Sequence, residues 1–278
     1  MYDNKFPELG ASVSVVIPCY RCSDSIGRAV ASVAAQTLRP LEVILVDDAS
    51  GDGTCDTLRS LQRAYPEGWI QLVFHELNKG PGAARNSGWN VSQGRYVAFL
   101  DADDTWHPEK LAVQYQWMEQ NPGVVMTGHD CPLYGENPED ECGTSATFQV
   151  ISPQMLLWSN VIFTPSVVVR RDIQDRFDPA KRYSEDYLLW LMIAFRRGKV
   201  ARSKQPLAFL HKAPYGAAGL SSHLWRMQRG ELHTYSTLYK SSMIGFSALC
   251  LLQAWSLMKF LRRITLLSLA SSRTRRTT

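Results

Sequence analysis

Short apolar segments alternate with longer amphipathic ones through the first hundred residues. Four apolar segments are rich in β-branched residues and fit buried strands, at residues 13–17, 41–46, 70–74 and 96–100. Between these segments, apolar residues recur at helical spacing, which predicts three helices. Strands that alternate with helices are typical of an α/β fold with a mostly parallel central sheet.

The second half of the chain predicts further elements in a less regular order. Pro108 suits the start of a helix, residues 124–126 and 167–169 fit strands, and the apolar run 187–195 fits a helix. Residues 131–147 are rich in Pro, Gly and acidic side chains, which predicts a loop or a mobile excursion.

Composition narrows the class of protein. A chain of 278 residues with 45% hydrophobic content can bury one core of enzyme size, and a net charge of +4 gives no sign of nucleic-acid binding. The six cysteines lack the paired spacing of a metal site, apart from the lone pair Cys19 and Cys22 after the first strand. Together with the polar N-terminus, this cysteine usage predicts that the protein is located in the reducing cytoplasm.

Paired carboxylates follow the second predicted strand. Asp47 and Asp48 come directly after it, at the edge of the sheet where ligands of parallel α/β folds bind. Adjacent strand residues point to opposite sides, so one carboxylate can accept hydrogen bonds from a ligand while the other stabilises the turn. A plain Asp-Gly turn with a helix cap is the alternative, and it explains Asp52 to Thr54 but not both earlier carboxylates.

A second acidic group follows the fourth predicted strand. If the backbone stays extended, Asp101 and Asp103 share one side, and a cation between them would offset their repulsion. Carboxylate oxygens suit Mg²⁺ or Mn²⁺, whose other ligands would be water and a diphosphate. The alternative is a solvated acidic turn, ending at Asp104, before a helix.

A glycine-rich turn at residues 78–88 opens the third predicted helix, whose first amides can face an anion. Within it, Arg85 can bind a phosphate, brace a carboxylate, or lie solvated on the helix face. The turn has neither the phosphate-loop order nor the dinucleotide-fold order of glycines, which argues against a nucleotide triphosphatase and a dehydrogenase.

Glu185 and Asp186 precede the apolar run 187–195. A carboxylate here can act as a general base toward an acceptor hydroxyl if the fold brings it opposite the metal. The alternative is that both residues only favour the start of a helix.

Five segments together resemble the family 2 glycosyltransferases of GT-A fold. Their order and spacing match over about residues 11–212, and the segments are VSVVIPCY (13–20), VDDASGDGT (46–54), NKGPGAARN (78–86), FLDADD (99–104) and SEDYLLW (184–190). The resemblance implies an inverting sugar transfer from a nucleotide-diphosphate donor, with UDP-sugars the commonest choice.

The resemblance also implies site residues. Pro18, Tyr20 and Asp48 would line the pocket for base and ribose, with Asp47 supporting the turn. Asp103 would bind the metal, with Asp101 as a ribose or metal contact. The catalytic base would be Asp186, with Glu185 beside it, and His211 would be a further candidate for the metal.

One sequence pattern of the processive synthases is missing from this chain, and two other functions remain as alternatives. The Q-x-x-R-W pattern of processive synthases is absent, so we expect addition of one sugar or few, in assembly of a bacterial surface glycan. A nucleotidyltransferase would need a basic glycine-rich loop after the first strand, where residues 18–21 read PCYR. A non-catalytic scaffold that kept the fold is the other rival, and turnover would distinguish it.

We expect a catalytic domain at residues 1–220, with a donor half at about 11–105 and an acceptor half at about 106–220. Residues 221–278 are expected to form a basic, helical C-terminal extension. Its apolar run, 241–258, is near the lower length limit for a membrane span, and arginines follow it. The extension can therefore span a membrane, lie on an anionic membrane surface, or pack on the catalytic domain.

Overall fold

The computed structural model describes residues 10–135, 147–212 and 223–274, with side chains up to residue 265. The strands are β1 Ala11–Cys19, β2 Pro40–Asp47, β3 Ile70–Phe74, β4 Tyr96–Phe99, β5 Thr105–Trp106, β6 Val124–Asp130, β7 Gln149–Ile151, β8 Val168–Arg170, β9 Lys199–Pro206 and β10 Ala208–Phe209. The helices are α1 Ile26–Ala34, α2 Thr54–Ala64, α3 Pro81–Val91, α4 Lys110–Gln120, α5 Pro153–Trp158, α6 Glu185–Arg196, α7 Leu224–Lys240 and α8 Phe246–Thr274, and a 3₁₀ turn spans Thr164–Ser166.

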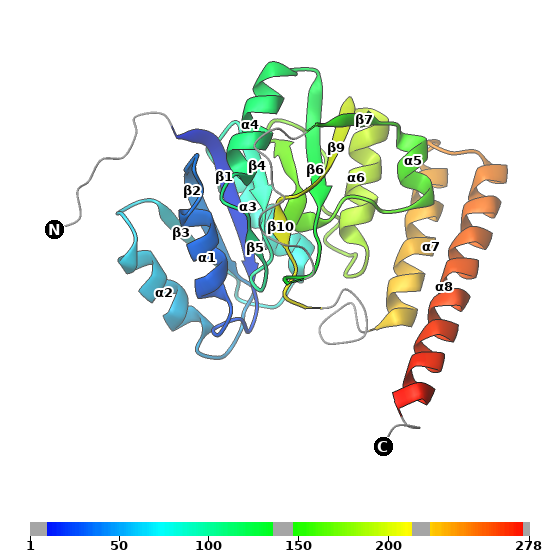
Figure 1. Cartoon of the computed structure of the whole chain (residues 1–278), viewed down its shortest axis with the longest axis horizontal. Coiled ribbons are helices and arrows are strands. Elements are labelled where there is room, and N and C mark those ends of the chain that lie inside the picture. Colours follow the sequence, from blue (N-terminus) through cyan, green and yellow to red (C-terminus); the bar gives the residue numbers. More distant parts are fainter. Residues whose placement is uncertain (1–9, 136–146, 213–222, 275–278) are drawn as a thin grey trace.

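Eight of the described strands form one sheet in the order β3-β2-β1-β4-β8-β6-β9-β7 (Figure 1). The four strands of the N-terminal half are parallel to one another, as predicted. β8 runs antiparallel to both β4 and β6, a direction that the sequence pattern did not indicate. The predicted α/β class with a mostly parallel sheet is therefore confirmed, with β8 and β7 as its antiparallel strands.

β1 shows how the apolar pattern produces the layers. Val13, Val15 and Ile17 belong to the core under α1 and α4, whereas Val16 packs with α3 on the opposite face of the sheet. Both faces of β1 are thus covered by helices, which explains why its sequence is continuously apolar rather than alternating.

Pro18 lies within β1, one residue before the strand ends, and not at the start of a turn. β4 pairs with β1 only as far as Val16, so at Pro18 the ladder continues on one side alone, with Val46 of β2 as the paired residue. A residue without an N–H group is tolerated where only one neighbour needs hydrogen bonds.

The predicted C-terminal helical extension is present as α7 and α8. Figure 1 shows the two helices side by side beyond α6, and Leu249, Leu252 and Phe260 of α8 are buried. In the described part of the chain, none of the helices is long and apolar enough to cross a bilayer. The predicted domain boundary at residue 220 and most of the predicted loop 131–147 lie outside the described residues.

Candidate active site

The carboxyl ends of β1, β2 and β4 meet at one edge of the sheet and carry the predicted donor residues. Asp47 stabilises the turn after β2. Its carboxylate accepts hydrogen bonds from the hydroxyl of Ser50 at 2.5 Å and from the Ser50 amide at 3.3 Å. The left-handed conformation of Ala49, with φ of 56°, makes this tight turn possible.

Asp48 holds the glycine-rich loop in place. Its two carboxylate oxygens accept hydrogen bonds from the backbone amides of Lys79 at 2.9 Å and Gly80 at 2.7 Å. The His75 ring lies 2.7 Å from the same carboxylate and 2.8 Å from the Ser87 hydroxyl. His75 was missed from the sequence, because a single histidine after β3 gives no signal until the fold brings it to Asp48.

Tyr20 lies just beyond β1 with 47% of its surface exposed, which leaves the ring accessible at this edge of the sheet. The neighbouring Arg21 has a left-handed backbone, with φ of 48°, and its amide donates to the Ser50 hydroxyl at 3.1 Å. The guanidinium of Arg21 lies 5.3 Å from the centre of the Tyr20 ring. The turn after β1 is therefore hydrogen-bonded to the turn after β2.

The backbone after β4 turns instead of staying extended, so the expected alternation of Asp101 and Asp103 on one side is wrong. The amide of Asp104 donates to the carbonyl of Asp101 at 3.1 Å, which closes a tight turn. Asp103 binds Lys212 at 2.8 Å, and its carbonyl accepts a hydrogen bond from Arg28 at 2.8 Å. The charges of Asp101 and Asp103 nevertheless still act on the third carboxylate of the turn, Asp104.

This crowding has a visible effect on Asp104. Burial, together with the charges of Asp101 and Asp103, raises the pKa of Asp104 to about 8. The side chains of Asp101 and Asp103 each keep 31% of their surface exposed, so both remain open to a ligand. A divalent cation needs only one or two protein carboxylates when phosphate and water supply the rest, and the residues present fit that requirement.

His211 reaches this turn through the antiparallel pair β5 and β10, in which Phe209 lies opposite Thr105. Its amide donates to Asp104 at 3.1 Å, and its ring nitrogen lies 2.9 Å from the Thr105 hydroxyl. Burial and the charge of Arg28 lower the pKa of His211. Within the described residues, no three His, Cys, Asp or Glu side chains lie together as a metal cluster.

Arg85 connects this turn with the start of α6. It is buried, which rules out the solvated alternative, and its terminal nitrogens donate to Asp101 at 2.7 Å and to Glu185 at 3.0 Å. Burial acts to lower the pKa of Arg85, but the two carboxylates outweigh it and raise the pKa overall. Arg85 therefore braces two carboxylates, which is one of the roles predicted for it.

Glu185 and Asp186 form the first turn of α6, after Ser184 in the left-handed conformation. Burial and the charge of Asp186 raise the pKa of Glu185 to about 7, against the opposing effect of Arg85. Burial also raises the pKa of Asp186, although Arg85 acts in the other direction. Asp186 accepts hydrogen bonds from the Thr164 hydroxyl at 3.2 Å and from the Tyr187 amide at 2.7 Å.

Arg85 therefore links the carboxyl end of β4, at Asp101, to the start of α6, at Glu185. There, Glu185 and Asp186 form a pair of carboxylates with raised pKa values. The model of the family described as Glycosyl transferase family 2 matches residues 14–177, which is more than half of the chain. The chain belongs to glycosyl transferase family 2.

Curated relatives agree with this family assignment. TuaG of Bacillus subtilis, a putative teichuronic acid biosynthesis glycosyltransferase, is 32% identical over 65% of this chain and 71% of its own length. The Escherichia coli glucosyltransferase WfgD is 31% identical over 65% of this chain and 69% of its own. ExoO of Rhizobium meliloti, a succinoglycan biosynthesis protein, is 32% identical over 64% of this chain, which spans about half (54%) of ExoO.

Solved structures share the fold of this family 2 glycosyltransferase. TarS of S. aureus in complex with UDP-GlcNAc gives a TM-score of 0.67 at 18% identity, covering 88% of this chain and 71% of TarS. The mannosyltransferase PcManGT of Pyrobaculum calidifontis, with GDP-Man and Mn²⁺, gives 0.66 at 19% identity, covering 95% of this chain and 77% of that one. The predicted GT-A fold is confirmed.

Proposed function

We propose that this protein is an inverting glycosyltransferase in the assembly of a bacterial surface polysaccharide. It transfers a sugar from a nucleotide-diphosphate donor, of which a UDP-sugar is the first candidate, to a hydroxyl of a glycan or lipid-linked acceptor. The observation that carries this proposal is the link from Asp101 through Arg85 to Glu185, because it joins the expected donor site to the residue that directly precedes the expected base, Asp186.

On this proposal, Pro18, Tyr20 and Asp48 hold the base and ribose of the donor. Support comes from the exposed ring of Tyr20 and from the position of Asp48, whose carboxylate already orders the Lys79–Gly80 amides beside the site. An exposed aromatic ring offers a flat surface for a nucleobase.

Asp103 and Asp101 would hold the divalent metal, Mn²⁺ or Mg²⁺, together with the donor diphosphate. When bound, the metal would neutralise charge that develops on the leaving diphosphate. Arg85 would keep Asp101 oriented, since its guanidinium is buried and fixed at both ends. Lys212 would have to release Asp103, or share it, when the metal enters.

Asp186 would act as the catalytic base. It takes the proton of the acceptor hydroxyl while that oxygen forms a bond to the anomeric carbon, and the bond from this carbon to the diphosphate breaks with its electron pair leaving on phosphate oxygen. Attack opposite the leaving group inverts the anomeric configuration. A raised pKa suits this role, because the carboxylate becomes a stronger base near neutral pH.

The names of relatives support the choice of donor and acceptor. WfgD is named as a transferase from UDP-Glc to GlcNAc-diphosphoundecaprenol, and TuaG and ExoO are named for teichuronic acid and succinoglycan biosynthesis. By similarity, a lipid-linked saccharide and a UDP-sugar are the first substrates to test here.

We further propose that α8 rests on the anionic inner face of the plasma membrane. Large apolar side chains of α8 remain exposed, among them Leu251 (63% exposed), Met258 (54%) and Leu261 (64%). After Glu231 the sequence contains seven lysines and arginines and no acidic residue. Apolar surface combined with positive charge favours anionic lipid over a second copy of the same basic helix.

The test of donor binding is thermal stability with UDP, GDP, CDP and dTDP, each with and without Mn²⁺. A ligand at about 100 times its Kd stabilises the folded state by about 2.7 kcal/mol. We expect one nucleotide to raise the melting temperature only with metal, and Asp103→Asn to abolish this shift. Asp56→Asn, at an exposed position of α2, should keep it. If every nucleotide leaves the melting temperature unchanged, the non-catalytic scaffold becomes the better account.

A further inference from the structure

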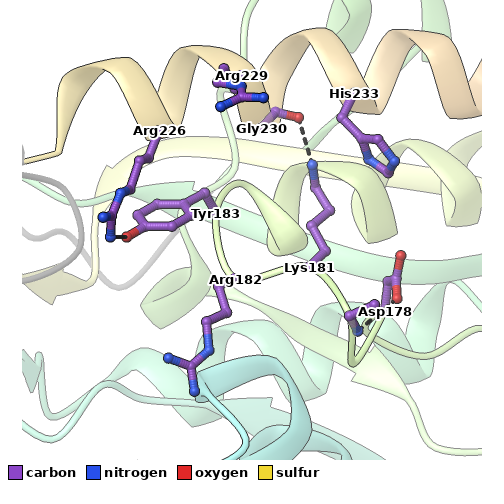
Figure 2. Close-up of a pocket in the computed structure, with 9 residues that line it drawn as sticks. Asp178, Lys181, Arg182, Tyr183, Arg226, Arg229, Gly230 and His233 are labelled. Carbon is purple, nitrogen blue, oxygen red and sulfur yellow. Dashed lines mark hydrogen bonds between the residues drawn. The ribbon is translucent and has the colours of Figure 1, made fainter.

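A basic pocket lies beside the proposed active site, between residues 178–183 and the first turns of α7 (Figure 2). Its volume is about 590 Å³. Its basic lining residues are Lys181, Arg182, Arg226, Arg229 and His233, and Asp178 is the one acidic residue among its described lining. None of these lysine and arginine side chains forms an ion pair with a carboxylate of the described residues.

Contacts with neutral groups fix the shape of this basic pocket. Lys181 donates to the carbonyl of Gly230 at 2.5 Å, and Arg226 donates to the Tyr183 hydroxyl at 3.2 Å, as Figure 2 shows. A Cβ atom at Gly230 would lie only 2.6 Å from the Tyr183 carbonyl oxygen, so α7 approaches this loop as closely as a glycine allows. Close backbone contact therefore holds α7 against this loop, and the lysine and arginines of the pocket have no ion-pair partner among the described residues.

The basic pocket adjoins both parts of the active site. The loop that carries Lys181 runs directly into Glu185 and Asp186, whose charges act to raise the pKa of Lys181 while burial lowers it to about 8. Arg182 donates to Asn78 at 2.6 Å, and Asn78 in turn donates to the carbonyl of Asp48 at 3.1 Å. A ligand in the pocket would thus lie between the expected base and the donor loop.

We propose that the basic pocket binds the phosphate groups of the acceptor, with the acceptor sugar directed toward Asp186. This inference rests on the proposed function and names the acceptor as a phosphorylated one. Arginine side chains bind phosphate through charge-assisted hydrogen bonds, and several unpaired cations at one place suit a diphosphate more than a neutral sugar. The pocket is also shaped by α7, which leads into the exposed apolar face of α8, so a lipid chain on the diphosphate would have apolar surface nearby.

The first experiment measures binding by titration calorimetry to the full chain saturated with UDP and Mn²⁺, so that the donor site is already filled. The probes are inorganic diphosphate, farnesyl diphosphate and farnesol. We expect farnesyl diphosphate to bind and farnesol to bind at least tenfold more weakly. Tighter binding of farnesyl diphosphate than of inorganic diphosphate identifies a lipid carrier as the source, whereas equal binding identifies the phosphates alone. Equal affinity for farnesol and farnesyl diphosphate would overturn the proposal.

The second experiment locates the binding. The double variant Arg226→Ala with Arg229→Ala should weaken farnesyl diphosphate at least tenfold, while Lys240→Ala, at the exposed far end of the same helix, should leave it unchanged. Both proteins should show the same UDP-dependent shift in melting temperature, which verifies that they are folded. Unchanged binding in the double variant would place the ligand elsewhere and refute the pocket.

Failure of this inference can be separated from failure of the proposed function. A protein that binds UDP with metal but no prenyl diphosphate keeps the glycosyltransferase proposal and loses the phosphate pocket. A protein that binds no nucleotide at all loses the proposed function first. In turnover assays, the double variant should raise the KM for a diphosphate-linked acceptor and leave the KM for the donor unchanged.

Discussion

The guanidinium group of Arg85 lies 2.7 Å from the carboxylate of Asp101, at the carboxyl end of β4. Its other terminal nitrogen binds Glu185, which lies 100 residues further along the chain. One buried side chain of α3 thereby fixes the position of α6 relative to the sheet edge. Arg85 thereby links the expected donor site to the residue that directly precedes the expected base, Asp186.

We expect Arg85→Ala to destabilise the protein by about 3 kcal/mol, because removing one partner leaves buried carboxylates uncompensated. The measurement is the free energy of unfolding from urea denaturation. Arg59→Ala is the matched control, since Arg59 pairs with Asp56 on the exposed surface of α2 and such pairs contribute less than about 1 kcal/mol. Equal losses in both variants would mean that the Arg85 link is not structural.

Asp186→Asn should lower kcat by at least about 100-fold, because an amide cannot accept the acceptor proton. The metal-dependent shift in melting temperature with UDP should persist, since the donor residues are unchanged. Steady-state rates with a UDP-sugar and a lipid-linked acceptor provide the readout. Asp56→Asn on exposed α2 serves as the control, and an active Asp186→Asn enzyme would exclude this residue as the base.

The rate should depend on pH through the carboxylates of α6. The base acts only when deprotonated, and the pKa values of Glu185 and Asp186 are both raised, that of Glu185 to about 7. We therefore expect kcat/KM to fall as pH decreases, at a pH above the ordinary range of an aspartate, with apparent pKa values that belong to the pair. Glu185→Gln removes a neighbouring negative charge and should move this fall to lower pH. A profile that is flat from pH 5 to 8 would contradict the assignment.

Gly88 of α3 lies where the helix packs most closely on the sheet. A Cβ atom there would approach Val16 to 2.4 Å and Val46 to 3.2 Å. Gly88→Ala should destabilise the protein by about 1–3 kcal/mol through overpacking. Gly27→Ala in α1 is the control, because no atom lies within 4 Å of its Cβ position, and alanine should stabilise that helix by about 0.5–1 kcal/mol. Calorimetric melting would reveal a difference in sign.

The apolar face of α8 should bind vesicles that contain phosphatidylglycerol and ignore neutral ones. Leu251→Glu combined with Leu261→Glu should reduce co-sedimentation about tenfold, because the charges oppose both burial and anionic lipid. Leu77→Glu, at an exposed leucine outside α8, should leave it unchanged. If the protein stays in the supernatant with every vesicle, membrane docking is excluded.

Much of the fold was predictable because the apolar runs are local and strongly patterned. The predicted strand at residues 70–74 matches β3, and the third predicted helix, opened by the glycine-rich turn, matches α3. By contrast, the antiparallel direction of β8 depends on the strands with which it pairs. The sequence of a three-residue strand does not indicate in which direction the strand runs. The extended geometry expected for Asp101 and Asp103 was wrong, because a backbone hydrogen bond from Asp104 to Asp101 closes the turn that the sequence pattern gave only as the alternative.

The sequence by itself determined the α/β class, the family and the carboxylates at the strand ends, because each depends on residues that are near one another in the chain. Only the tertiary structure decided which groups those carboxylates bind. Arg85 joins Asp101 to Glu185, His75 binds Asp48, and Lys212 binds Asp103, and each pair comes from separate segments. Such contacts arise from packing of the whole sheet and its helices, which no local pattern of residues encodes.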